Sequence, residues 1–382
     1  MLAGKSLVVV EVPAASHTPV RFRETEFICV GTYKKKIKDY PEKERSLWAV
    51  FQNRHFESDI AIEDASADQI TSLLDYPAYF DLTEQPLPSN LEAILNRFMD
   101  EKFIVSRHDG RFDITNFGAI LLAKDLSRFG RLSRKTLRGI FYKGKNRVET
   151  IREMPGAKGY AVGFDRAVTF INDHLPLNEE IGQTFRREVR IYPEVAIREL
   201  MANTLIHQDF YLTGAGPMVE IFADRIEFTN PGASLIDPLR FIDQPPRSRN
   251  EGLAAFMRRI NICEERGTGI DKVITAVEAV PLPPPDFRVS GDNTIAVLYS
   301  ERSLAEMTQP ERMRACYQHA CLMYETNERM TNGSLRKRMK IAEQNYSMVS
   351  RIIAATVQEG LVKPFDPEMG SKRLSSYVPF WA

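Results

Sequence analysis

The sequence predicts a mixed α/β protein of the α+β type, and three stretches of patterning support this class. From about residue 135 to 300, short apolar runs typical of strands alternate with longer amphipathic segments typical of helices. Before this region, from about 60 to 125, and after it, from about 303, helical patterns dominate and short hairpins accompany them. The chain therefore combines a central layered domain with smaller helical modules.

Composition agrees with a folded, globular chain. Its 382 residues are long enough for two or three domains, and 43% hydrophobic with 27% charged residues is ordinary usage. Fifty-one Lys and Arg balance fifty-one Asp and Glu, so a polyanion would have to be met by local basic patches. The four cysteines are scattered, no apolar run approaches the roughly 18 residues that span a bilayer, and no signal-peptide cleavage pattern follows Met1. We therefore expect a cytoplasmic protein without a membrane-spanning segment.

Residues 1–60 are expected to form a small β unit, because the apolar runs LVVVEV and EFICVG alternate with turn-rich links. The basic run that follows contains Lys34, Lys35, Lys36 and Lys38, which could contact phosphates. A solvated loop is at least an equal alternative, since DYPEKER supplies acidic residues close by.

Residues 61–130 are predicted as a helical connector. SNLEAILNRFMDEKFIV begins as an amphipathic helix, Asp109 and Gly110 form a hairpin turn, and TNFGAILLAK starts a further helix. This order of helix, hairpin and helix resembles a winged-helix module.

Residues 131–302 are predicted as the central domain, and their most informative helix is IYPEVAIRELMANTLIHQDF. Glu199 and Asn203 are four residues apart, so they project from one face of that helix, about one turn from each other. A carboxamide oxygen suits Mg²⁺, and a neighbouring carboxylate can orient or deprotonate a water. The alternative is that Glu199 pairs with Arg198 or another basic side chain on a solvated face.

Two later motifs favour the nucleotide-site interpretation. The hairpin GPMVEIFADRIEFTN ends in Asn-Pro-Gly at residues 230–232, and Gly267-Thr268-Gly269 then opens a helix. Gly-x-Gly before a helix lets backbone N–H groups approach a phosphate, and the helix N-terminus favours negative charge.

This order of motifs resembles the GHKL (Bergerat-fold) ATPases, and more closely their divergent bacterial branch in predicted transcriptional regulators. Those regulators join a Schlafen-type (Alba-like) domain to the ATPase domain. The resemblance implies that Glu199 activates water, that Asn203 binds Mg²⁺, and that the segment from about 233 to 266 is an ATP lid. It also implies nucleotide contacts for Asn230, Gly232, Gly267, Thr268 and Gly269. Asn230 stands where the family has an adenine-binding Asp, and a neutral acceptor holds an amine more weakly.

The N-terminal unit is similar to the second half of a Schlafen domain, through LVVVEVPAASHTPVRF and EFICVGTYKKK. The first half is missing from the sequence, so the chain is either a fragment or carries a remnant of this module. The acidic residues of nuclease-active members lie in that half, so no nuclease site is carried over.

Residues 303–382 are predicted as a C-terminal winged helix. SLRKRMK, a turn, NYSMVSRIIAATVQEG with Gly360 as its stop, and two short strands give the expected order. From residue 329 to the end, nine Lys and Arg stand against four Asp and Glu. The predicted DNA contacts are Ser347, Ser350 and Arg351 on the recognition helix and Lys372 and Arg373 on the wing. The alternative is a dimerisation or packing module.

Two other patterns are assigned to structure. Gly4-Lys5-Ser6 lacks the upstream Gly of a P-loop, so a helicase interpretation has no Walker A motif to support it. Cys316, His319 and Cys321 cannot all point one way from a single helix, so we expect core packing instead of a metal site.

The sequence and the resemblance together predict an ATP-binding, DNA-interacting regulator with an Mg-ATP site, acting as a homodimer because relatives dimerise around ATP. They leave open whether it is a weak ATPase of GHKL type. The alternatives are a non-enzymatic DNA-binding protein with a degenerate pocket, or a nucleic-acid processing protein if a full Schlafen domain lies upstream.

Overall fold

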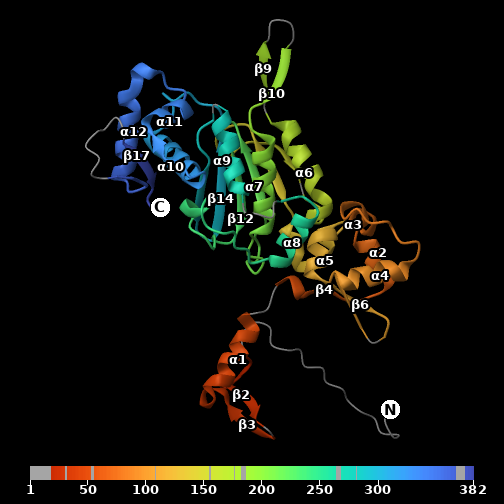
Figure 1. Cartoon of the computed structure of the whole chain (residues 1–382). Coiled ribbons are helices and arrows are strands. Elements are labelled where there is room, and N and C mark those ends of the chain that lie inside the picture. The colour runs from red at the N-terminus through yellow and green to blue at the C-terminus, as the bar shows by residue number, and fades with distance from the viewer. Residues whose placement is uncertain are drawn as a thin grey trace, which may run out of the picture. The chain divides into compact units, whose positions relative to one another are not determined.

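The computed structural model describes most of the chain, and it divides into two compact units. The described residues are 19–30, 32–52, 56–107, 109–154, 156–175, 177–181, 186–263, 268–280, 282–366 and 375–382. The first unit ends at His55 and the second runs from Phe56 to Ala382 (Figure 1). The predicted boundary at residue 60 falls close to this division.

The first unit is a small antiparallel sheet followed by a helix. Its elements are β1 (Arg21–Phe22), β2 (Thr25–Val30), β3 (Tyr33–Lys36) and α1 (Pro41–Gln52). Lys34, Lys35 and Lys36 of the basic run therefore lie in a strand whose four residues are exposed, and Lys38 lies in the short 3-10 helix Ile37–Asp39. Pairing with β2 and the placement of the Lys34 ammonium 4.0 Å from the Phe27 ring centroid stabilise the strand.

The second unit begins with a helical part built around a three-stranded sheet of order β4-β6-β5. Gly110, at a φ of +76°, makes the turn between β5 and β6, as predicted. Side-chain caps start three of the helices, which are capped by Ser66, Asn90 and Thr115. The elements are β4 (Ile60–Ala65), α2 (Ala67–Leu73), α3 (Tyr76–Leu82), α4 (Leu91–Asp100), β5 (Ile104–Ser106), β6 (Phe112–Thr115) and α5 (Asn116–Leu122).

A six-stranded sheet of order β13-β14-β12-β11-β7-β8 forms the centre of the second unit. All of its neighbouring strands are antiparallel except the parallel pair β7 and β11. The strands are β7 (Arg138–Tyr142), β8 (Thr150–Met154), β11 (Met218–Phe222), β12 (Arg225–Pro231), β13 (Asp286–Ser290) and β14 (Asn293–Tyr299). The predicted α/β class is confirmed.

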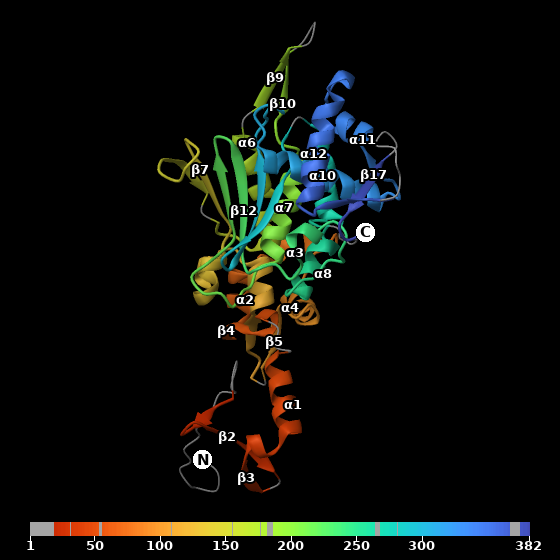
Figure 2. The same ribbon diagram turned by 90° about the vertical axis from the view of Figure 1, so that its left-hand side faces the viewer.

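Helices cover one face of this sheet (Figures 1 and 2). They are α6 (Tyr160–His174), α7 (Glu194–Ile206) and α9 (Gly269–Ala279). Helix α8 (Glu251–Arg259) follows the sheet's central hairpin in sequence, and β9 (Leu177–Ile181) pairs with β10 (Arg186–Arg190) between α6 and α7. One hydrophobic core joins these helices to the helical part, so the predicted connector and central domain share their interior.

The C-terminal part has its own smaller core. A capping box at Thr308 starts its first helix, and Gly360, at a φ of +72°, follows its last. Its elements are α10 (Gln309–Glu325), β15 (Met330–Thr331), α11 (Asn332–Arg338), α12 (Tyr346–Gln358), β16 (Val362–Pro364) and β17 (Ser376–Pro379). We call residues 303–382 the C-terminal module.

Across the described residues, every helix is too short or too polar to cross a lipid bilayer.

Candidate functional site

Helix α7 carries Glu199 and Asn203 in surroundings that differ between the two side chains. Glu199 is 7% exposed, whereas Asn203 is half-buried. Neither amide atom of the Asn203 side chain makes a hydrogen bond within the described residues. The remaining face of the helix packs in the core through Ala196, Ile197, Leu200, Met201 and Leu205. The helix thus carries a carboxylate and an amide about one turn apart on the same side.

Arg198, which the sequence offered as a partner for Glu199, has other partners in the structure. The guanidinium of Arg198 donates to the Asp165 carboxylate at 2.9 Å and to the Asn261 carbonyl at 3.2 Å. It also lies 5.0 Å from the Phe164 ring centroid. Because Glu199 is almost fully buried, it does not belong to a solvated face.

The start of α9 lies directly against Glu199. A Cβ atom built on Gly269 would stand 2.7 Å from Oε2 of Glu199, closer than side-chain carbons approach in proteins. Gly269 is the first residue of α9, and Thr268 precedes it as the N-cap. Two motifs far apart in the sequence are therefore neighbours, with a helix N-terminus beside the α7 carboxylate. Gly267 lies outside the described residues.

Asn230 and Gly232 are held against the end of α7. The Asn230 side-chain amide donates to the His207 carbonyl at 3.2 Å, which leaves its oxygen as an acceptor. Gly232 has a φ of +114°, and an added Cβ would lie 2.9 Å from the Asp209 backbone nitrogen. Its own N–H donates to the Asp292 carbonyl at 2.6 Å. The N–H of Gly232 is therefore already paired, and its carbonyl accepts from the Thr294 hydroxyl at 2.7 Å.

His207 ends α7 as an uncharged imidazole. Burial, and after it the positive charge of Arg249, lower the pKa of His207 to about 4. The side chain is therefore neutral near pH 7 and adds no positive charge to the site. The backbone carbonyl of His207 accepts a hydrogen bond from the Asn230 amide.

The segment predicted as an ATP lid, from about 233 to 266, is for the most part firmly attached. Helix α8 lies inside it, and its Phe256 ring packs 5.6 Å from Phe103 in the aromatic core. Glu57 accepts the backbone N–H groups of Gly252 and Leu253 at the start of α8. Opening a lid that spans this whole segment would expose core side chains of α8.

The residues before α8, which we call the connecting segment (residues 233–250), are tied at their two ends. Arg249 donates to the Ala233 carbonyl at 2.7 Å. Asn250, 3% exposed, donates to the carbonyls of Ile206 and Gln208, each at 2.8 Å. These bonds fix the base of the segment on the end of α7.

The predicted DNA-contacting residues are only partly available. Ser347 and Arg351 are exposed on α12. Ser350 is half-buried, and its hydroxyl accepts a hydrogen bond from the Asn332 amide at 3.0 Å. The periodicity of α12 alone does not show that α11 packs against it. That packing brings the Ser350 hydroxyl to Asn332. Lys372 and Arg373 lie outside the described residues.

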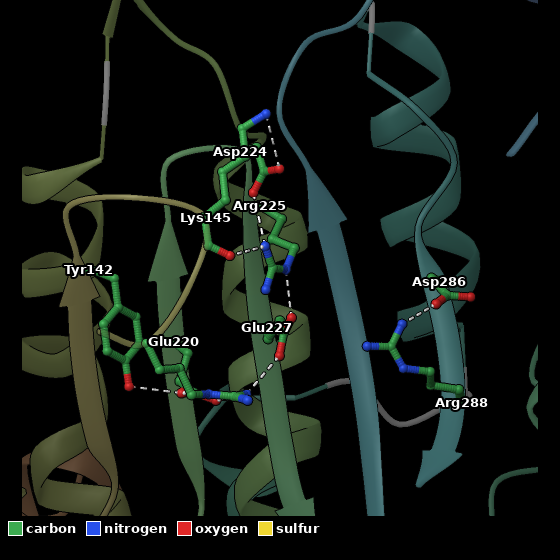
Figure 3. Close-up of polar contacts among 9 residues, drawn as sticks. Tyr142, Lys145, Glu220, Asp224, Arg225, Glu227, Asp286 and Arg288 are labelled. Carbon is green, nitrogen blue, oxygen red and sulfur yellow. Dashed lines mark hydrogen bonds and ion pairs between the residues drawn. The ribbon is translucent and has the colours of Figure 1, made fainter. Parts of the chain in front are cut away.

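A second polar cluster occupies the sheet face opposite α7, and the sequence analysis missed it (Figure 3). Glu220 on β11 and Glu227 on β12 are direct cross-strand partners, 1% and 5% exposed. Arg147 donates to both carboxylates, at 2.6 and 3.2 Å, and Tyr142 donates to Glu220 at 3.0 Å. Two opposed carboxylates would repel, so the guanidinium stabilises the pair. The alternating pattern of the two strands was the available signal.

Two cavities lie away from Glu199 and Asn203. One of about 360 Å³ is lined by the start of α6 and the strand β8, and another of about 250 Å³ is lined by the connecting segment, α9, β13 and α10. Neither lining includes Glu199 or Asn203. The candidate site is accordingly defined by side-chain placement and not by an enclosed cavity.

Cys316 and Cys321 lie in the core of the C-terminal module, which confirms core packing. Burial raises the pKa of each thiol to about 12, so both are protonated. His319 instead lies 3.2 Å from the Ser334 hydroxyl and 3.4 Å from Glu278. No group of three or more potential metal-ligating side chains occurs in the described part of the chain.

Part of the second unit is similar to an ATPase-type domain. Residues 214–298 match the family described as putative ATP-dependent DNA helicase recG C-terminal, of the HATPase type. The match includes Asn230 and Gly269 but begins after Glu199 and Asn203. A comparison with curated proteins finds no match.

A solved structure shares the fold of nearly the whole chain. It is the crystal structure of the DIP2311 protein from Corynebacterium diphtheriae, with a TM-score of 0.51 and 15% sequence identity. The similarity covers 94% of this chain and 70% of that chain.

Proposed function

We propose that this chain is an ATP-binding, DNA-interacting regulator with an Mg-ATP site between α7 and the start of α9. The contact between Gly269 and Glu199 carries this proposal. It joins two motifs that the resemblance assigns to one nucleotide site. The ATPase-type match over residues 214–298 supports the same assignment.

The side chains present suit Mg-ATP. Asn203 offers an amide oxygen without an internal partner, and Glu199 offers a carboxylate beside it. Thr268 and Gly269 place the backbone at the N-terminus of an 11-residue helix where phosphate oxygens are favoured. A bound Mg²⁺ would neutralise phosphate charge. In this proposal Glu199 orients or deprotonates the attacking water, and Asn203 holds the metal.

The base would be recognised at Asn230. Its amide nitrogen donates one N–H to the His207 carbonyl, and its side-chain oxygen accepts no hydrogen bond within the described residues, so the oxygen can serve a ligand. An oxygen acceptor pairs with the exocyclic amine of adenine and not with the carbonyl that guanine carries at the equivalent position. A contact through this oxygen would favour ATP over GTP, with weaker discrimination than a carboxylate would give, because an amide also carries a second N–H that can pair with a carbonyl.

Replacing Gly269 by Ala tests the site directly. The new Cβ would overlap the Glu199 carboxylate and displace it toward the phosphates, so we expect ATP affinity to fall roughly tenfold or more. Gly144→Ala is the matched control, because no atom lies within 4 Å of its added Cβ. Calorimetric titration with Mg-ATP measures both variants. No binding to the parent chain would refute the proposed site, and equal affinity in Gly269→Ala would remove Gly269 from it.

DNA binding is proposed for the C-terminal module. The segment from residue 329 onward carries nine Lys and Arg against four Asp and Glu, and Arg351 and Lys337 are exposed on α12 and α11. The helicase description belongs to the matched family, whose model covers residues 214–298, and is not part of this proposal. The homodimer implied by the resemblance stays a prediction.

Arg351→Ala is expected to weaken binding to duplex DNA several-fold and to reduce the slope of log affinity against log salt by about 1. Lys145→Ala, which removes a cation that is exposed on the hairpin between β7 and β8, should change neither quantity. Fluorescence anisotropy at several salt concentrations gives both. If Arg351→Ala and Lys145→Ala behave alike, α12 does not contact DNA.

A further inference from the structure

The connecting segment contacts the C-terminal module at its middle. The Leu239 carbonyl accepts a hydrogen bond from the Tyr317 hydroxyl, and the Trp381 indole N–H donates to the same hydroxyl at 3.2 Å. The Arg240 guanidinium lies 5.1 Å from the Trp381 ring centroid. We call the group formed by Leu239, Arg240, Tyr317 and Trp381 the relay contact.

The relay contact is held in a defined geometry. Two hydrogen bonds of 2.8 and 2.9 Å join the Arg240 guanidinium to the Asp243 carboxylate. Ile242 packs against the core of the C-terminal module. Tyr317 is 3% exposed, so breaking its hydrogen bonds without replacement is costly. A displacement of the connecting segment would therefore disturb its contacts with Tyr317 of α10 and with Trp381 near the C-terminal end of the chain.

Helix α9 is a second connection between the candidate nucleotide site and the C-terminal module. Its first residue lies against Glu199, and its Glu278 receives the Arg338 guanidinium at 2.8 Å and lies 3.4 Å from His319. The helix is continuous from Gly269 to Ala279. One rigid element thus reaches from the candidate phosphate contact to α10 and α11.

The region between these two connections is incompletely packed. The cavity of about 250 Å³ is bounded by Leu239 and Ile242 of the connecting segment, by Ile270 and Ile274 of α9, and by Tyr317. Side chains that border an empty volume can repack without overlap. The connecting segment therefore has room to take a second position against the C-terminal module.

We propose that the relay contact transmits the occupancy of the nucleotide site to the C-terminal module. This inference rests on the proposed function. The base of the connecting segment is bonded to the end of α7 through Asn250, next to Asn230 and His207. A nucleotide seated on Asn230 changes the position of that base, and the relay contact carries the change to Tyr317 and Trp381. Two sites that bias one two-position element are coupled in both directions.

The two tryptophans allow a test on the full chain. They are Trp48 and Trp381, so Trp48→Phe leaves Trp381 as the single reporter at the relay contact. We expect its emission to change on titration with Mg-ATP, with the same half-saturation that calorimetry gives. Tyr317→Phe removes the hydroxyl that joins Leu239 to Trp381. It should retain ATP affinity within about twofold and lose most of the emission change.

Tyr324→Phe is the matched control. Tyr324 is on the same helix and its ring meets Trp381 edge-on at 5.3 Å, but it makes no hydrogen bond to the connecting segment within the described residues. It should keep both ATP affinity and the emission change. Arg240→Ala, which removes the guanidinium and leaves the Tyr317 hydroxyl in place, gives a second disruption and should reduce the emission change as well.

The outcomes separate the inference from the function on which it rests. ATP binding in calorimetry with a silent Trp381, or a full emission change in both Tyr317→Phe and Arg240→Ala, would overturn the relay alone. The absence of ATP binding in the parent chain would overturn the nucleotide site and the relay with it. Loss of the emission change in Tyr317→Phe and its retention in Tyr324→Phe is the supporting result.

Discussion

Glu199→Gln is expected to lower ATP turnover roughly 10²-fold or more while Mg-ATP binding stays close to that of the parent chain. Gln keeps the size and the hydrogen-bonding reach of the side chain but cannot take a proton from water. Because Glu199 is 7% exposed and lies against Gly269, the substitution changes basicity at one defined position. Phosphate release under saturating ATP, together with calorimetry, measures the two effects separately.

Glu194→Gln is the control for this experiment. Glu194 is on the same helix, its side chain is 63% exposed, and it pairs with Arg190 at 2.6 Å on the surface. An exposed pair of this kind contributes little, so turnover and stability should both stay at the parent level. Equal turnover in Glu199→Gln and the parent chain would show that Glu199 is not the base.

Asn203→Ala is expected to weaken Mg-ATP binding by about 1–3 kcal/mol, which is roughly a 5- to 150-fold loss of affinity. The side chain makes no internal hydrogen bond in the described structure, so its removal should leave the fold unchanged. Its loss matters only when a metal is present. ATP titrated without Mg²⁺ should therefore bind the variant and the parent chain equally.

Asn203→Asp provides the rescue, since a carboxylate oxygen is also a good Mg²⁺ ligand. Thermal unfolding of both variants without ligand checks that any loss of binding is not a loss of folding. Should Asn203→Ala and Glu199→Gln both bind Mg-ATP like the parent chain, and should the parent show no turnover above background, the non-enzymatic alternative is correct.

Much of the local structure could be predicted because it depends on neighbouring residues. The helical spacing of Glu199 and Asn203, the turn at Gly110 and the end of α12 at Gly360 all follow from periodicity and backbone preference. The order of motifs also predicted that the helix carrying Glu199 and the helix opened at Gly269 serve one site, and their contact agrees with it. Whether that site binds ATP stays a prediction.

The sequence is least informative about residues whose environment is set by distant segments. The region from 233 to 266 reads as a glycine-rich, charged loop, yet α8 within it is buried by packing against Phe103 and capped by Glu57. The sequence predicts Ser350 as an exposed helix residue, yet its hydroxyl accepts a hydrogen bond from the Asn332 amide of the preceding helix. In each case the partner is not visible in the local pattern.

The sequence by itself determined the α/β class, most of the helices and strands, and the side chains offered for nucleotide chemistry, because these depend on interactions over a few residues. Only the tertiary structure decided that Gly269 lies against Glu199, that the Asn230 amide donates to the His207 carbonyl, and that the connecting segment contacts Tyr317 and Trp381. The physical reason is that burial and hydrogen bonding between distant segments have no periodicity in the sequence. They arise when the chain closes one core around its sheet and brings those segments into contact.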